Sequence, residues 1–157
     1  MTQPDIIETL LEKPYHVIDV LPKQVPADSP GQYFKVEKYF LSRLDVICRH
    51  LADLVIKLNC YADVKVSTDG ESWITDFPPE DLVKFFSDSV ATRSPLYILI
   101  NSDEALITFS GDDHYMTVYN APAELLELIG ALAGAEGLFL CPRYPSPLQG
   151  QDDVIRL

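Results

Sequence analysis

The stretch from residue 96 to residue 119 most constrains how this chain can fold. Three short apolar or alternating segments, at 96–100, 105–109 and 114–119, are separated by four-residue turns at 101–104 and 110–113. Consecutive short strands that are joined by tight turns form an antiparallel meander. The sequence therefore predicts an antiparallel sheet that is built around these three strands.

Two segments have the 3.6-residue repeat of amphipathic helices. Apolar residues recur from about 36 to about 58, and the same period returns from about 121 to about 133, after Asn120 as a possible cap. The aromatic stretch 33–39 also suits a strand, so the start of the long helix stays open. We expect both helices to pack on one face of the sheet, which gives an α+β fold. Shorter patterns predict helices near 4–12 and 78–92 and strands near 15–20, 63–67 and 138–140.

The length fits one domain. A chain of 157 residues can bury roughly 70% of the surface of its unfolded form without disulfides or metals. We assign 1–141 to a single α+β domain and expect 142–157, which offers little to bury, to be a loosely held tail. The proline-rich stretch 21–32 is expected to be a long loop that is functional or that wraps the fold.

The net charge of −12 is concentrated in the second part of the chain. Residues 1–60 hold eight acids and seven bases, whereas 61–157 hold sixteen acids and five bases. Such a field repels nucleic acid and anionic lipid and attracts basic proteins. We therefore expect a basic protein partner and neither nucleic acid nor a membrane. The chain shows no secretory leader and no apolar run of about 20 residues, so a cytoplasmic location is expected.

The residues most often used in catalysis form no recognisable motif. Cys48, Cys60 and Cys141 are odd in number and lack metal-ligand spacing, so we interpret them as reduced packing residues. A nucleophile elbow, a phosphate loop and a dinucleotide fingerprint are all missing from the sequence. We therefore expect no cofactor and no catalytic residues.

A metal-dependent hydrolase is the alternative that the acidic turns suggest. Asp112, Asp113 and His114 are all potential metal ligands. Consecutive strand residues point to opposite faces, so the side chains of Asp113 and His114 should diverge. The turns at 101–104 and 110–113 should also lie about 17 Å apart, at opposite ends of the strand between them. One ion cannot bridge that distance, and we expect no metal site.

The last strand of the meander suggests a protein-binding surface. Tyr115 and Tyr119 alternate with Met116 and Val118, so both tyrosines lie on one face. If helices cover the other face, the tyrosines are exposed beside acidic turns, a composition typical of protein interfaces; alternatively, both faces are covered. We expect the aromatic and acidic side chains to gather over one patch and to bind the partner. The expected binding residues are Trp73, Asp103, Glu104, Asp112, Asp113, Tyr115 and Tyr119.

Several segments resemble a family of small, acidic, uncharacterised bacterial cytoplasmic proteins. They are YHVIDVLP at 15–22, KLNCY at 57–61, and a stretch that runs from GDD at 111–113 through MTVYN at 116–120 to AEGLF at 135–139. The likeness covers most of residues 5–140. In size, acidity and α+β pattern the chain is also similar to immunity proteins of bacterial polymorphic toxin systems. That similarity implies an inhibitor of a cognate toxin, and it implies no functional residues.

These observations lead to one expected function and two alternatives. The expected function is an acidic protein-binding module, most concretely an immunity protein that inhibits a basic toxin such as a nuclease. The first alternative is the hydrolase that uses Asp112, Asp113 and His114. The second is a structural subunit that forms a homodimer through the tyrosine face.

Overall fold

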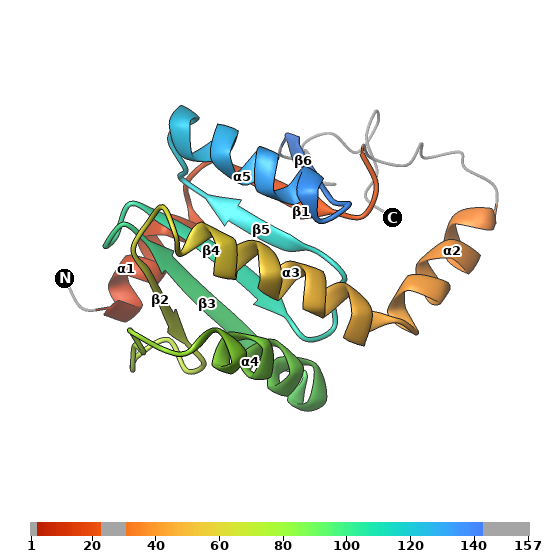
Figure 1. Cartoon of the computed structure of the whole chain (residues 1–157), viewed down its shortest axis with the longest axis horizontal. Helices are drawn as coiled ribbons and strands as arrows, with labels where there is room; N and C mark the ends of the chain where they lie inside the picture. The colour runs from red at the N-terminus through yellow and green to blue at the C-terminus, as the bar shows by residue number, and fades with distance from the viewer. Residues whose placement is uncertain (1–2, 23–30, 143–157) are drawn as a thin grey trace.

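A six-stranded antiparallel sheet forms the centre of the protein (Figure 1). The computed structural model describes residues 3–22 and 31–142. The strand order is β2-β3-β4-β5-β1-β6, and every neighbouring pair is antiparallel. The strands are β1 (Tyr15–Asp19), β2 (Val64–Ser67), β3 (Pro95–Ile100), β4 (Ala105–Ser110), β5 (Met116–Tyr119) and β6 (Phe139–Pro142).

The predicted meander is confirmed as β3, β4 and β5, and it occupies the middle of the sheet. Its register places Ile98 opposite Ile107, and Ile107 opposite Val118. All three side chains are fully buried, and each contributes about 1.5–3 kcal/mol of hydrophobic stabilisation. The predicted α+β class with a single domain is also confirmed.

Three helices lie side by side on one face of the sheet, with α3 in the middle (Figure 1). They are α3 (Leu44–Leu58), α4 (Pro79–Thr92) and α5 (Ala123–Ala135). α3 buries seven residues, among them Leu51, Leu54 and Leu58, because its apolar positions repeat with the helical period. The predicted packing of the long helix and the C-terminal helix on one face is therefore confirmed for α3 and α5.

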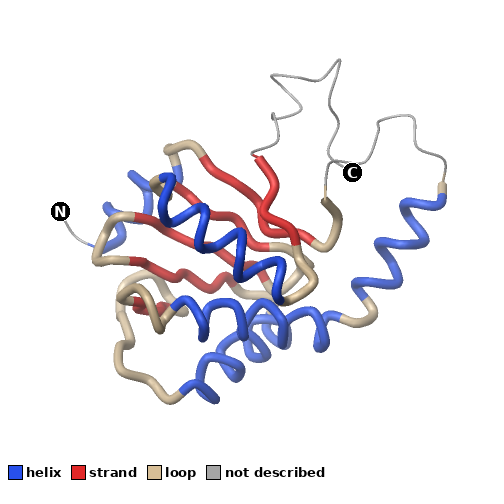
Figure 2. Tube along the Cα trace, turned by 45° about the horizontal axis from the view of Figure 1, so that its top comes forward, coloured by secondary structure: helices blue, strands red, loops and turns tan. Residues whose placement is uncertain are grey.

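The prediction of one continuous helix over 36–58 is wrong. The chain forms α2 (Gln32–Leu41) and then α3, with a break at Ser42 and Arg43, as Figure 2 shows. The Ser42 hydroxyl donates to the Tyr39 carbonyl at 2.6 Å, and Arg43 has the non-helical backbone angles φ −120° and ψ 31°. A serine that bonds to a nearby backbone carbonyl competes with helix continuation. The alternative of a strand at 33–39 is also wrong, because these residues lie in α2.

The described residues cover the opposite face of the sheet only in part. α1 (Gln3–Leu11) lies on it, with Ile6, Ile7 and Leu10 packed against Leu99 and Leu106. Most of the predicted loop at 21–32 and nearly all of the predicted tail at 142–157 lie outside the described residues. Within the described ranges, no helix is both long enough and apolar enough to cross a membrane.

Gly111 provides a test of how closely the meander packs on α4. A Cβ atom at Gly111 would lie 1.9 Å from the Ser89 carbonyl oxygen and 2.6 Å from its carbon, both backbone atoms of α4. We therefore expect Gly111→Ala to lower the free energy of unfolding by about 3 kcal/mol or more. Urea denaturation followed by circular dichroism measures this change.

Gly134→Ala is the matched control. Gly134 lies in α5 with no atom within 4 Å of an added Cβ. Alanine at such a helical position should raise the free energy of unfolding by about 0.5–1 kcal/mol. Equal effects of the two substitutions would contradict the close approach of Gly111 to α4.

Candidate functional site

The uncovered part of the second sheet face holds a shallow groove beside α1. The strand register aligns Tyr97 with Thr108 and Thr108 with Thr117, so one row of hydroxyl-bearing side chains crosses the three strands of the meander. The groove has a volume of about 250 Å³. We call it the tyrosine groove; it is lined by Leu11, Pro95, Tyr97, Thr108, Phe109, Ser110, Asp113, Tyr115 and Thr117.

Asp113 places a carboxyl group at one end of the tyrosine groove. It is half-buried, and burial raises the pKa of its carboxyl; Asp112 adds to the rise, while His114 and a hydrogen bond from the Tyr115 hydroxyl oppose it. A partly desolvated carboxylate interacts more strongly with a cation than one in open water does. The groove therefore combines aromatic rings and hydroxyl groups with one site that favours a positive charge.

Asp112, the residue before Asp113, remains in solvent. Its Oδ1 is 3.6 Å from Arg93 Nε, and both side chains are more than half exposed. An exposed ion pair of this kind contributes about 0–1 kcal/mol. A competing cation can therefore replace Arg93 at Asp112 with little loss of free energy.

The structure separates the acidic residues that were expected to share one patch. Asp112 and Asp113 follow β4, whereas Asp103 and Glu104 precede it, so the two pairs lie at opposite ends of this strand. The expectation of a single acidic patch is therefore wrong, because successive turns of a meander alternate between the two ends of a sheet. Of the residues that were expected to bind the partner, the tyrosine groove brings together only Asp113 and Tyr115.

Trp73 and Tyr119, two of the expected anchors, contribute to a small apolar core under α1. Both are half-buried and pack around Leu99 and Leu106. Trp73 Nε1 is enclosed and has no hydrogen-bond partner among the described residues. The Tyr119 ring lies 5.6 Å from that of Tyr15, and burial raises the pKa of its hydroxyl. These two side chains stabilise α1 on the sheet and offer a partner little surface.

Reasoning from the sequence missed Tyr97 and Thr108 as groove residues. The apolar run 96–100 was interpreted as a strand covered on both faces or central in the sheet. Tyr97 is the one residue of this run with a polar group, and pairing it with Thr108 and Thr117 requires the register between strands. The available signal was that Tyr97, Thr108 and Thr117 each carry a hydroxyl group within an otherwise apolar part of their strand.

His114 precedes β5 and faces Asp19 and Glu37, whereas Asp113 lines the tyrosine groove. His114 is 7% exposed, and its Nδ1 lies 3.4 Å from Asp19 Oδ1, while its Nε2 lies 3.8 Å from Glu37 Oε2. These contacts join the ends of β1 and β5 to α2. Across residues 3–22 and 31–142, no three His, Cys, Asp or Glu side chains are grouped as a metal site.

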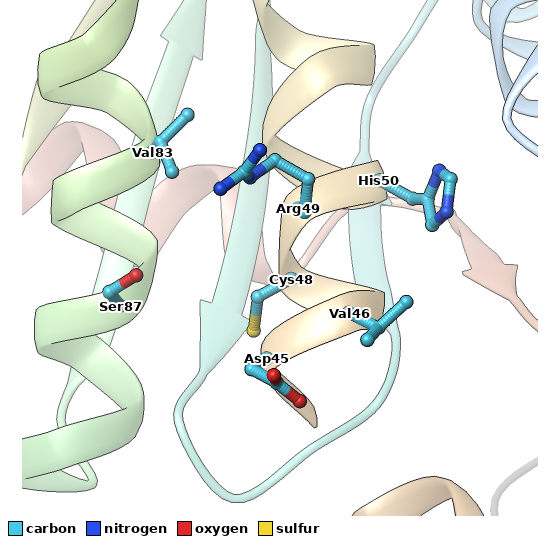
Figure 3. Close-up of a pocket in the computed structure, with 7 residues that line it drawn as sticks. All are labelled: Asp45, Val46, Cys48, Arg49, His50, Val83 and Ser87. Atoms are coloured by element: carbon cyan, nitrogen blue, oxygen red, sulfur yellow. The ribbon is translucent and has the colours of Figure 1, made fainter. Parts of the chain in front are cut away.

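A second hollow, of about 340 Å³, lies between α3 and α4 (Figure 3). Cys48 and Arg49 extend from α3 toward α4, whereas His50 points away on the other side of α3. Burial, assisted by Asp45, raises the pKa of the Cys48 thiol to about 12. A thiol of that pKa without a base beside it is a poor nucleophile. This hollow therefore lacks a Cys–His pair.

His50 instead takes part in a contact between helices. Its Nδ1 lies 2.9 Å from Glu136 Oε1, and Lys57 Nζ binds the other oxygen of the same carboxylate. Glu136 follows α5, and its side chain is 7% exposed. The two bases on α3 thus fix the end of α5, which is a structural role.

The contacts of His114 predict a pH dependence of stability. The Asp19 carboxylate raises the pKa of the His114 ring, burial opposes this, and Glu37 adds to the rise. Because the pKa is higher in the folded state, His114 contributes fully to the free energy of unfolding below a pH of about 6.5 and loses this contribution as pH rises through the folded pKa. The difference in stability between the wild type and His114→Gln should therefore shrink between about pH 6 and about pH 9 in urea titrations.

His16→Gln is the control for this experiment. Burial lowers the pKa of His16, so any contribution of this residue is lost on acidification and not at high pH. A wild-type minus His114→Gln difference that is constant or grows over the same range would contradict the ion pairing of His114.

Comparisons of the whole chain with protein-family models, with curated proteins and with solved structures reveal no match. Similarity to a protein of established activity therefore assigns neither a family nor a reaction to this chain. The tyrosine groove and the charge around it are the features on which a function can be argued.

Proposed function

We propose that this protein is a protein-binding module and that the tyrosine groove binds a basic segment of its partner. The observation on which this rests is the groove itself, where two tyrosines and two threonines lie beside a half-buried carboxyl. Tyrosine provides a large contact area at a low cost in conformational entropy, and it is enriched in protein interfaces.

The proposed mode of binding assigns separate roles to the lining residues. A lysine or arginine of the partner pairs with Asp113 and displaces Arg93 from Asp112. An adjoining apolar or aromatic side chain packs between the rings of Tyr97 and Tyr115, and polar backbone groups bond to Thr108 and Thr117. The net charge of −12 steers the basic partner toward the protein and raises the association rate.

An immunity protein that blocks a cationic toxin, such as a nuclease, fits this chemistry. Toxins that bind nucleic acid carry basic surfaces, and an acidic inhibitor can cover them without itself binding nucleic acid. The support for this proposal is the acidity of the chain and the tyrosine groove. The hydrolase alternative gains no support from a specific contact, because His114 faces Asp19 and Glu37.

The proposal predicts that Asp113→Asn weakens partner binding by at least about tenfold, since a partly desolvated partner charge would be left unpaired. Asp103→Asn is the matched control, because it removes the same charge at the far end of β4, and it should change the affinity by no more than about twofold. Wild-type protein and both variants would serve as baits in a lysate of the source organism, followed by surface plasmon resonance with the protein that is recovered.

The dependence of the association rate on ionic strength is a second measurement on the same complex. The association rate should fall by at least about tenfold between about 0.05 M and about 0.5 M salt, because the attraction acts over a Debye length. A recovered protein that binds the Asp113→Asn variant as tightly as the wild type, or associates at a rate independent of salt, would contradict binding at the groove.

A further inference from the structure

α2 makes little contact with the rest of the described chain. None of its ten residues is buried, and the helix extends away from the sheet and from the other helices in both views (Figures 1 and 2). Nine large apolar side chains are exposed in the described residues, and five of these fall between 34 and 46. They are Phe34 (63% exposed), Tyr39 (56%), Val36 (41%), Leu41 (39%) and Val46 (39%).

One narrow stripe of α2 faces the rest of the described chain. Glu37 approaches His114, the Phe40 ring lies 6.3 Å from the His114 ring, and the Tyr33 hydroxyl donates to Glu37 at 3.2 Å. At about 100° per residue, Phe34 and Leu41 fall on one side of this stripe, and Val36 and Tyr39 fall on the other. The apolar arc of α2 is therefore wider than the surface that the body of the protein covers.

α2 and the two residues after it carry a charge opposite to that of the whole chain. Residues 32–43 contain Lys35, Lys38 and Arg43 but only one acid, Glu37, which gives +2, while the chain as a whole has −12. An acidic protein surface therefore complements this segment. A basic partner of the kind proposed for the tyrosine groove is repelled here, and an anionic lipid surface is repelled by the molecule as a whole.

A second copy of the chain supplies both the acidic surface and enough area. An aromatic side chain can bury about 150–250 Å², so Phe34 and Tyr39, both more than half exposed, leave roughly 200 Å² of ring surface uncovered on each copy. Reciprocal contact doubles this area and adds the aliphatic side chains and the surface beneath them. A total of about 1,000 Å², the lower range for a specific interface, is then within reach.

We propose that α2 is a self-association element and that, in a homodimer, the α2 helix of each copy packs on the acidic body of the other. Phe34 and Tyr39 provide the apolar contact, and Lys35 and Lys38 pair with carboxylates of the second copy. None of the residues of α2 lines the tyrosine groove.

Sedimentation equilibrium of the full chain tests this proposal. The wild type should be a dimer at micromolar concentration, and Phe34→Ser with Tyr39→Ser should raise the dimer dissociation constant by at least about tenfold. Tyr61→Ser with Ile74→Ser is the matched control, since these side chains are 71% and 38% exposed and lie outside α2. A wild type that stays monomeric to about 0.1 mM, or an α2 variant that dimerises as tightly as the wild type, would overturn the proposal.

A charge-reversal variant keeps the test decisive if the serine variant fails to fold. Lys35→Glu with Lys38→Glu changes exposed polar positions only and should also weaken the dimer. Unchanged circular dichroism shows in each case that the fold is retained. An unchanged dissociation constant for this folded variant would overturn the electrostatic contact.

Cross-linking distinguishes a second copy of the chain from other molecules that could bind α2. A mixture of ¹⁵N-labelled and unlabelled protein, treated with a carbodiimide that joins amines to carboxylates, should give mixed-isotope peptides that link Lys35 or Lys38 to an Asp or Glu. Mixed-isotope links that all lack these lysines would overturn the proposal. Binding to phosphatidylserine vesicles that depends on Phe34 and Tyr39 would also overturn it, because a membrane would then be the occupant.

Discussion

The structure depends on the alternation of side chains across one antiparallel sheet whose two faces are covered unequally. Ile98, Ile107 and Val118 point toward α3, α4 and α5 and form the main core, whereas Tyr97, Thr108 and Thr117 point the other way. In the part of the chain that the structure describes, α1 and Trp73 cover only part of that second face. The tyrosine groove lies beside the end of α1, on the part of this face that the described residues leave open.

The turn at 110–113 and the residue after it connect the groove with the rest of the molecule. Gly111 lies against the backbone of α4, Asp113 lines the groove, and His114 faces Asp19 and Glu37. Through the contact of His114 with Glu37, this segment also touches the stripe of α2 that faces the described body of the protein. A change in this short segment therefore reaches both the tyrosine groove and the contact of α2 with the body of the protein.

The two proposed surfaces differ in charge, so each of them favours a different kind of partner. The groove is lined by Asp113 and favours a cation, whereas α2 contains Lys35 and Lys38 and favours an acidic surface. A basic partner is thus directed to the groove and away from α2. The possible catalytic residues do not gather in the same way, since Cys48 has a raised pKa and His50 is held by Glu136 on the other side of α3.

The sequence by itself determined the α+β class, the meander, and the helices that cover one face, because a period of 2 or 3.6 residues is a local property of the chain. It also indicated that Asp113 and His114 diverge. Only the tertiary structure decided that the helix breaks at Ser42, whose hydroxyl donates a hydrogen bond to the Tyr39 carbonyl. The same holds for the packing of Trp73 beneath α1. The groove likewise required the register of Tyr97 with Thr108 and Thr117, which is set by pairing between strands and which no local pattern specifies.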